Sequence, residues 1–169
     1  MMSRMSFTFV QVDPQDHALL SQVGDITKRA YVDGGHLAVD DDYATHLADA
    51  AGRARDGELW AAVEDRTVLG SVAFGPPGSP LAEVAGPDEA EFRMLSVDAA
   101  ARGRGVGSAL VRQCIARARA HHLRAIVLST QPTMRDAHRI YERLGFARTP
   151  ERDWKPVPSV TLKTYRLDL

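Results

Sequence analysis

The sequence is poor in cysteine and has no long apolar run. Its 169 residues include a single cysteine, Cys114, so no disulfide can form within the chain. No stretch approaches the roughly 18 consecutive apolar residues of a membrane helix, and no secretory hydrophobic segment is seen. We therefore expect a cytoplasmic protein with no membrane association. Internal repeats and low-complexity tracts are also absent, and this length suits one core, so we expect a single domain over residues 1–169.

The charged residues are unevenly distributed, although the net charge is only −1. Residues 1–92 carry 6 basic and 16 acidic side chains, whereas residues 93–148 carry 11 basic and 3 acidic ones. A basic segment favours a polyanionic ligand, and an acidic segment favours a cationic second substrate. The alternative is that these charges only cover solvated helix faces. Nucleic acid is disfavoured as a partner, because the acidic segment would repel a phosphate backbone.

Hydrophobic periodicity divides the chain into an alternation of strands and helices. Short apolar runs predict strands at 7–12, 59–63, 68–74, 91–97, 124–130, 146–148 and 160–167. Helical spacing predicts helices from Pro14 to Asp33, from the Asp40–Asp42 cluster to Gly57, from near Gly105 through Ala118, and from Thr133 to Leu144. Prolines and glycines predict a loop at 75–88 and a proline-rich connection at 150–158.

The stretch 95–110, LSVDAAARGRGVGSAL, carries the most specific signal of the chain. An apolar segment ends at Val97, and three glycines, at 103, 105 and 107, then open a helix. Glycine at alternate positions lets the backbone come close to a ligand and aim successive N–H groups at it. The helix start adds unpaired N–H donors and a positive dipole end. This arrangement predicts a site for a pyrophosphate group.

Two arginines, Arg102 and Arg104, would add full positive charges beside these N–H groups. The stretch differs from two other phosphate-binding loops. A Walker loop needs Gly-Lys-Ser/Thr, and no lysine is near. A dinucleotide fingerprint needs a third glycine or alanine, but Ser108 and Leu110 stand at the two positions where it would fall. The remaining alternative is a glycine-rich turn with solvated arginines.

Two motifs, together with the order of elements, resemble the GCN5-related N-acetyltransferase (GNAT) family. Residues 102–107, RGRGVG, match the family's Arg/Gln-x-x-Gly-x-Gly/Ala directly after Leu95-Ser96-Val97, and residues 137–146, AHRIYERLGF, are similar to its helix ending in Tyr-x-x-x-Gly-Phe. The resemblance covers essentially the whole chain. It implies an α/β (α+β) fold whose mixed, mostly antiparallel sheet has about six to seven strands and about four flanking helices. The sheet would splay between its fourth and fifth strands.

The resemblance implies that acetyl-CoA is the co-substrate and inserts where the sheet splays. A strand beside the splay has unpaired backbone groups that need partners. The backbone of Leu95, Ser96 and Val97 would therefore hold the pantetheine arm, with the Leu95 N–H near the thioester carbonyl. Pyrophosphate binding would fall to the glycine loop and the first helical turn, namely Arg102, Gly103, Arg104, Gly105, Val106, Gly107 and Ser108. Ala137 and Tyr141 would complete the cofactor site.

The resemblance also assigns two catalytic residues, Tyr141 and Glu91. The Tyr141 hydroxyl would protonate the departing CoA thiolate, and the alternative is an ordinary buried aromatic. Glu91 stands where some family members have a catalytic glutamate, and strand alternation predicts that it shares a face with Arg93, Leu95 and Val97. A water chain as the base, and a Glu91–Arg93 salt bridge, are the alternatives. The histidines lack partners at ligand spacing, so we expect no metal site.

The activity implied by the resemblance is acetyl transfer to a primary amine of a small molecule or of a protein, directly within a ternary complex, so the expected partner is a small-molecule or peptide amine. A non-catalytic acetyl-CoA-binding regulatory module and an RNA-directed acyltransferase are the alternatives. Acidic side chains in 31–43 and 75–91, which would shape the acceptor site, favour a cationic amine. Arg93 would instead suit the carboxylate of an amino acid. A homodimer is a further expectation, because dimers are common in this family.

Overall fold

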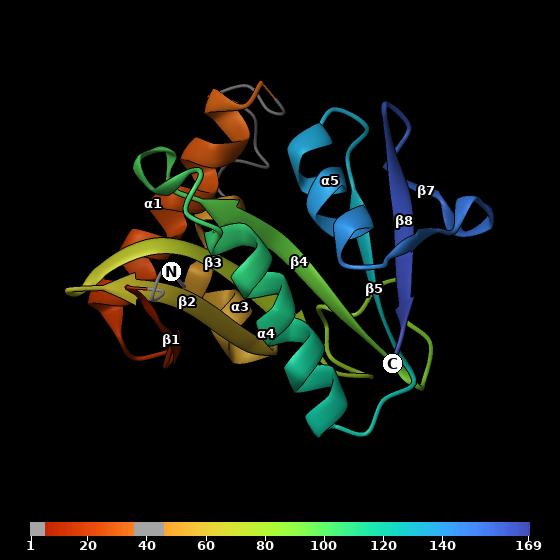
Figure 1. The fold of residues 1–169 in the computed structure, drawn as a ribbon, viewed down its shortest axis with the longest axis horizontal. Coiled ribbons are helices and arrows are strands. Elements are labelled where there is room, and N and C mark those ends of the chain that lie inside the picture. Colours follow the sequence, from red (N-terminus) through yellow and green to blue (C-terminus); the bar gives the residue numbers. More distant parts are fainter. Residues whose placement is uncertain (1–5, 36–45) are drawn as a thin grey trace, which may run out of the picture.

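The computed structural model describes residues 6–35 and 46–169 (Figure 1). Its strands are β1 (Thr8–Gln11), β2 (Glu58–Glu64), β3 (Thr67–Gly75), β4 (Glu89–Val97), β5 (Ala125–Thr130), β6 (Ala147–Arg148), β7 (Trp154–Val157) and β8 (Val160–Asp168). The helices are α1 (His17–Asp33), α3 (Ala50–Asp56), α4 (Val106–Ala120) and α5 (Arg135–Arg143), with short 3₁₀ segments η1 (Ala99–Ala101) and η2 (Pro150–Arg152).

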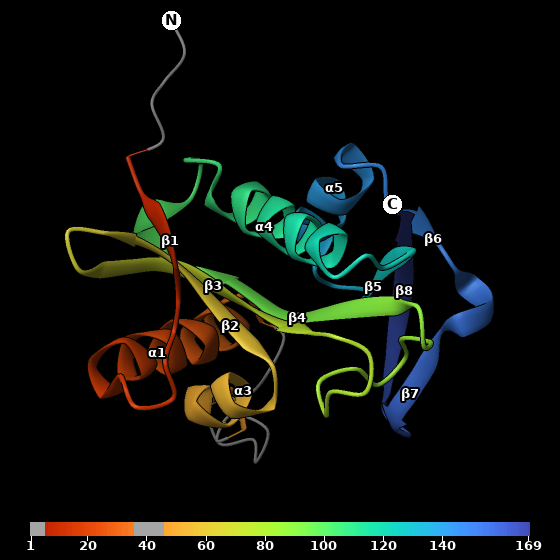
Figure 2. The same ribbon diagram turned by 90° about the horizontal axis from the view of Figure 1, so that it is seen from below.

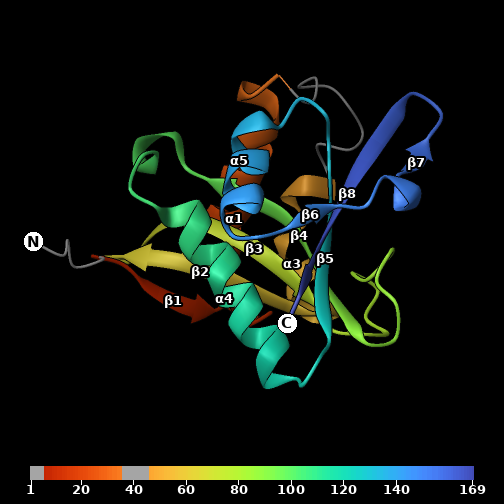
Figure 3. The ribbon, with the colours of Figure 1, turned by 45° about the vertical axis from the view of Figure 1, so that its right-hand side comes forward.

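The strands form one mixed sheet in the order β1-β2-β3-β4-β5-β8-β6, with β7 paired to β8. Every pairing is antiparallel except that of β4 with β5, so the expected mixed, mostly antiparallel fold is confirmed. The strand missed from the sequence is β7, within the expected proline-rich connection. Pro156 is tolerated there because, among the described strands, β7 pairs with β8 alone and is an edge strand (Figure 3).

Helices cover both faces of the sheet (Figure 2). One face is covered by α1 and α3, which pack on β2 and β3 through a cluster centred on Val23, Leu59 and Val68. The other is covered by α4 and α5, whose larger cluster includes Phe74, Phe92 and Leu110. None of the described helices combines the length and the apolar character that a membrane crossing needs.

Two predicted helix starts differ from the structure. α1 begins at His17 rather than at Pro14, because the Asp16 carboxylate accepts the Leu19 N–H at 3.2 Å and caps the helix there. Asp13 forms a turn instead. α3 begins at Ala50 and is capped by Asp49, whose carboxylate accepts the Gly52 N–H at 3.0 Å. The expected start at Asp40–Asp42 lies outside the described residues.

The sheet opens between β4 and β5. These strands pair in parallel from Glu89 opposite Ala125 to Phe92 opposite Leu128, and no pair follows in the described part of the chain. β5 continues along β8 as far as Thr130, while β4 continues along β3 (Figures 1 and 3). From Arg93 onward, one edge of β4 therefore has no neighbouring strand among residues 6–35 and 46–169.

A β-bulge at Met94 reverses the alternation of β4. Ser71 of β3 lies opposite Ser96, but Ala73 lies opposite Arg93, so β4 holds one extra residue between these pairs, and Met94 has a φ of 54°. Phe92 and Leu95 consequently both face α4, although they are three residues apart. Arg93 and Met94 face α3 and line a small cavity of 50 Å³ beside it.

The expectation that Glu91 and Arg93 share a face with Leu95 and Val97 is therefore wrong. Leu95 and Val97 pack against the cluster under α4, whereas Glu91 and Arg93 contact the loop that precedes β4 on the opposite face. The physical reason is the bulge, because a strict period of two fails once a strand carries an extra residue.

Candidate functional site

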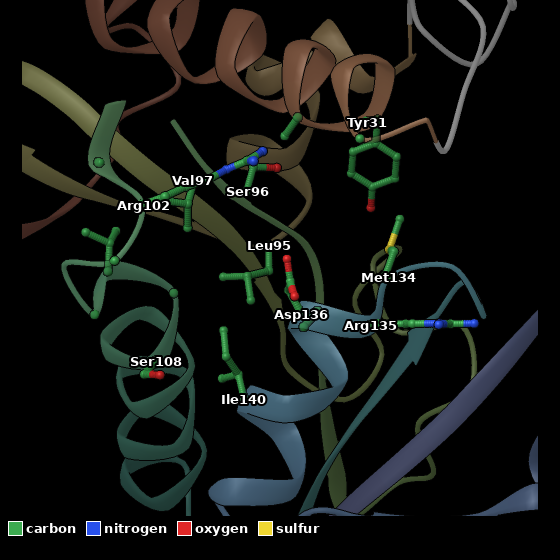
Figure 4. Close-up of a pocket in the computed structure, with 18 of the residues that line it drawn as sticks. Tyr31, Leu95, Ser96, Val97, Arg102, Ser108, Met134, Arg135, Asp136 and Ile140 are labelled. Carbon is green, nitrogen blue, oxygen red and sulfur yellow. The ribbon is translucent and has the colours of Figure 1, made fainter. Parts of the chain in front are cut away.

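A cavity of 570 Å³ lies at the point where β4 and β5 diverge (Figure 4). Its walls come from the last turn of α1, the end of β4, the loop and first turn of α4, and one side of α5 with the turn that precedes it. Since α1 and α4 cover opposite faces of the sheet, the cavity passes from one face to the other. It can do so only because the ladder between β4 and β5 stops at Phe92.

Most of the residues expected at a cofactor site line this cavity. These residues are Leu95, Ser96, Val97, Arg102, Gly103, Gly105, Val106, Gly107, Ser108 and Ala137. Arg104 and Tyr141 were also expected at the cofactor site, and Glu91 was expected as a catalytic base, but none of the three is among the residues that line this cavity. The residues expected at the cofactor site therefore coincide with the cavity walls more closely than the two residues predicted to be catalytic.

The glycine loop adopts a backbone conformation that ordinary residues avoid. Gly103 and Gly105 have φ values of 79° and 77°, in the left-handed region. A Cβ at either position would meet no other atom within 4 Å, so the backbone angle rather than crowding makes glycine necessary. Gly107 is different, because a Cβ there would lie 3.0 Å from Cδ1 of Ile140. It allows α4 and α5 to approach each other beside the cavity.

The first turn of α4 presents backbone donors to the cavity. The first i→i−4 bond of the helix joins the Ala109 N–H to the Gly105 carbonyl at 3.0 Å. The N–H groups of Val106, Gly107 and Ser108 precede this bond, and no side chain caps the helix. Together with Arg102, which lines the same wall, these donors favour a bound anion.

Arg104 points elsewhere. Its guanidinium donates to the Glu64 carboxylate at 2.7 Å and also to the hydroxyl of Ser6. Hydrogen bonds with Glu64 raise the pKa of Arg104 above its ordinary value. Arg104 thus ties the glycine loop to the hairpin between β2 and β3. The sequence around Arg102 and Arg104 could not predict this ion pair, because Glu64 is 40 residues away in sequence.

The open edge of β4 forms the floor of the cavity. Leu95, Ser96 and Val97 are consecutive, and side chains of an extended strand alternate between faces, so a cavity that meets all three runs along the backbone edge. That edge has unpaired N–H and C=O groups because β5 has diverged. A ligand with amide groups along its length matches this edge.

Tyr141 lies immediately behind the cavity wall. Its neighbours on the same helical face, Ala137 and Ile140, line the cavity, but Tyr141 is only 4% exposed. Its ring packs 5.8 Å from that of Phe92 and 5.9 Å from that of Phe146. Burial, with a smaller effect of Tyr31, raises the pKa of Tyr141 well above its ordinary value. The phenol therefore keeps its proton at neutral pH.

Glu91 is buried on the α3 face of the sheet, with 1% of its surface exposed. Its Oε1 accepts the N–H groups of Val84 at 2.8 Å and Ala85 at 3.0 Å, and its Oε2 has no hydrogen-bond partner among the described residues. Burial raises the pKa of Glu91 above its ordinary value. Arg93 pairs with Glu83 at 2.6 Å, and no Glu91–Arg93 bridge is seen in the described part of the chain.

Two of the histidines contact neighbouring side chains. His121 lies 3.2 Å from the Glu58 carboxylate, and His138 lies 3.2 Å from the hydroxyl of Thr130. Within residues 6–35 and 46–169, no group of three or more histidine, cysteine, aspartate or glutamate side chains is placed to hold a metal ion.

Several lining residues carried no motif in the sequence. They are Ala30, Tyr31, Gly34, Ala101, Thr133, Met134, Arg135 and Asp136; Ile140 and Arg143 also line the cavity and lie within the second motif, without an expected role. Tyr31 falls inside the range expected to shape the acceptor site, but nothing distinguished it from its neighbours. The residues just before Ala137 could have been predicted to line the cavity. They directly precede the second motif in sequence, so they must lie next to Ala137 in space.

Comparison with known proteins agrees with this geometry. The family described as "Acetyltransferase (GNAT) family" matches residues 20–146. The chain belongs to the GNAT family. Its curated relatives include the N-acetylaspartate synthetase of Rattus norvegicus, 36% identical over 104 residues, which are 62% of this chain and 32% of the relative. The mycothiol acetyltransferase of Cellulomonas flavigena is 38% identical over 95 residues, which are 56% of this chain and 25% of that one.

The chain thus spans about a third or less of the length of these curated GNAT relatives. A solved GNAT-like structure, yncA of Salmonella typhimurium with its cofactor acetyl-CoA, has a TM-score of 0.66. That alignment covers 96% of this chain and 94% of the other, at 23% identity. At this identity the likeness concerns the fold.

Proposed function

We propose that this protein is an acetyl-CoA-dependent N-acetyltransferase that acts on a primary amine of a small molecule or peptide. The observation that carries the proposal is the cavity through the sheet, which joins the glycine loop of α4 to the open edge of β4. A non-catalytic binding module would need only the loop and the edge. The cavity, however, also extends to α1 on the other face of the sheet, and a second substrate could enter from that side.

The residues present fit acetyl-CoA. Left-handed glycines and the unpaired N–H groups of the α4 start suit the pyrophosphate, and Arg102 adds charge beside them. The backbone edge from Leu95 to Val97 suits the two amides of the pantetheine arm, and the Leu95 N–H would donate to the thioester carbonyl. Acetyl-CoA supplies the activated acetyl group. The family membership and the acetyltransferase name of the Cellulomonas flavigena relative support the same co-substrate.

We propose Tyr141 as the proton donor to the departing sulfur. The phenol is protonated at neutral pH, as a general acid requires, and its helical neighbours Ala137 and Ile140 line the cavity. For transfer, a small movement of Tyr141 toward the cavity would be needed, because its ring lies behind these two side chains.

Glu91 is the proposed base, which must act on the amine before it attacks because an ammonium has no lone pair. The raised pKa and the unpartnered Oε2 support this role. Since Glu91 does not line the cavity, a water molecule would have to carry the proton from the amine. The hydrogen bonds to Val84 and Ala85 give Glu91 a structural role as well.

The deciding experiment measures CoA thiol release from acetyl-CoA in the presence of single amines. The panel is L-aspartate, because one relative is an N-acetylaspartate synthetase, together with 1,4-diaminobutane and a lysine-containing peptide. N-acetyl-L-aspartate serves as the control without a free amine. We expect thiol release that depends on one of the amines, with the acetylated product seen by mass spectrometry. Binding of acetyl-CoA without release for any amine would support the non-catalytic module.

A further inference from the structure

We propose that Tyr31 and Asp136 form the acceptor subsite and that they recognise a primary ammonium group. The two residues come from opposite faces of the sheet, Tyr31 from the last turn of α1 and Asp136 from the first turn of α5. This inference rests on the proposed function, because it names the substrate class of the same cavity.

The position of the subsite follows from the course of the cavity. The glycine loop and Arg102 occupy one end, and the thioester is expected beside Leu95 in the middle. An acceptor must reach that point from the remaining side, where Tyr31 and the start of α5 form the walls (Figure 4). Two substrates that meet end to end in one passage do not compete for space.

Tyr31 supplies an aromatic ring and a hydroxyl to this end. Its ring lies under α1, and its hydroxyl points into the cavity toward Met134 (Figure 4). Of the described residues that line the cavity, Tyr31 is the one aromatic side chain. An aromatic face attracts a cation, and a phenol oxygen accepts a hydrogen bond from an N–H. Tyr31 can therefore hold the ammonium beside the cavity, and the nitrogen must still lose a proton before it can attack a thioester near Leu95.

Asp136 supplies the negative charge. Its carboxylate points from α5 into the same space, whereas Arg135 points away from it (Figure 4). Among the described lining residues it is the one carboxylate. Asp136 lies 3.5 Å from Arg139, but the two side chains are 96% and 74% exposed, and such an ion pair contributes little. A substrate ammonium can therefore replace Arg139 at small cost.

The subsite also distinguishes substrate from product. Acetylation converts the ammonium into a neutral amide, which loses the attraction to Asp136 and to the ring of Tyr31. The acetylated product therefore binds more weakly than the amine, and this favours its release.

Calorimetry tests the subsite without turnover. Titration of 1,4-diaminobutane into the CoA-saturated protein should give a Kd that rises about tenfold in Asp136→Asn and about fivefold in Tyr31→Phe. The matched controls are Glu142→Gln on the same helix and Tyr165→Phe, neither of which lines the cavity. Both should stay within about twofold of the original protein. The Kd for CoA should not change in any variant.

The results separate this proposal from the proposed function. Absence of diamine binding, or a Kd unchanged in both Asp136→Asn and Tyr31→Phe, would overturn the subsite, even if amine-dependent thiol release is observed. Conversely, diamine binding that depends on Asp136 with no thiol release would retain the subsite and reject the transferase. Asp136 is exposed, so its variants should fold. Asp136→Lys gives a second test, because it should abolish diamine binding.

Discussion

Glu89 and Glu91, two residues apart on β4, together hold three consecutive N–H groups of the loop before that strand. The Glu91 carboxylate accepts the N–H groups of Val84 and Ala85, and the Glu89 carboxylate accepts that of Gly86 at 2.8 Å. Their electrostatic surroundings differ, however. Arg152 and Arg166 donate to Glu89, whereas Oε2 of Glu91 has no partner in the described part of the chain.

Glu89→Gln should lower the unfolding free energy at neutral pH. It should also reduce the loss of stability that the original protein shows as pH falls. Burial opposes ionisation, but hydrogen bonds from Arg152, the Gly86 N–H and Arg166 outweigh it and lower the pKa of Glu89 to about 2. A carboxyl with a lowered pKa stabilises the fold above its ordinary pKa of 4.5 and loses this effect as pH falls toward 2.

We therefore expect Glu89→Gln to cost about 2 kcal/mol of unfolding free energy at pH 7 and less with each step below pH 4.5. Urea unfolding at a series of pH values measures the difference. A constant difference between pH 5 and about 2.5 would contradict the ion-pair explanation.

Glu91→Gln should show the opposite pH dependence. Burial raises the pKa of Glu91, so the folded state holds the proton more tightly than the unfolded state does. Stability of the original protein then falls as pH rises from 4.5 through the raised value. Glutamine keeps an oxygen for the two loop N–H groups and does not ionise. In urea unfolding, the unfolding free energy of the variant should therefore increase relative to that of the original protein as pH rises over this range.

The same variant tests the proposed base. If Glu91 accepts the proton of the amine, kcat/KM of the original protein should fall on the acidic side of the raised pKa, and Glu91→Gln should lack this limb. Two profiles of identical shape would favour a base supplied by water molecules alone.

Arg102 and Arg104 form a matched pair for acetyl-CoA binding. Arg102 lines the cavity, whereas Arg104 binds Glu64 outside it. Arg102→Ala should raise the Kd for acetyl-CoA about tenfold, and Arg104→Ala should change it less than about twofold. Calorimetry at low and moderate salt measures both. Equal losses would mean that general charge, rather than position, attracts the ligand.

Gly105→Ala should impair binding through the backbone. Its φ of 77° costs a residue with a Cβ about 1–2 kcal/mol, and relief of this strain would turn the N–H groups of the first α4 turn away from the cavity. Gly78→Ala is the control, because Gly78 has a φ of 83° and equally open space around it but lies outside the cavity. Both variants should lose stability, and only Gly105→Ala should lose acetyl-CoA affinity.

Tyr141→Phe should lower kcat by about a hundredfold or more, since general acids contribute about two to four orders of magnitude. Acetyl-CoA affinity and the unfolding midpoint should change little, because phenylalanine keeps the packing against Phe92 and Phe146. Tyr165→Phe, which removes a phenol outside the cavity, is the control for turnover. A loss in kcat below about tenfold, with folding intact, would argue against the acid role.

The sequence was most informative where a local motif specifies local backbone. The glycine loop, the α4 start and the strand before them lie as expected, because left-handed angles and apolar periods are properties of a few adjacent residues. The order of strands and the splay came from the family resemblance. β7 was missed because Pro156 argues against a strand in any position except an edge.

Contacts between distant segments were not predictable in the same way. Arg104 finds Glu64 through the arrangement of a hairpin and a loop, and Tyr31 reaches the cavity because α1 ends beside the splay. The face assigned to Glu91 was wrong for a local reason. The amino-acid sequence of β4 does not indicate that Met94 is an extra residue. A regular alternation of faces fits the same apolar pattern.

The bulge at Met94 lies beside the point where the β4–β5 pairing ends and the sheet opens. A chain without this residue would keep Phe92, Leu95 and Val97 on one face, in ordinary alternation. Its straightened strand could continue the ladder with β5 past Leu128 to Ser129 and Thr130, and the passage would close. Bulges bend strands, and this one lies two residues beyond the last β4–β5 pair. One inserted residue thus lies beside the point where the sheet opens and the cavity begins.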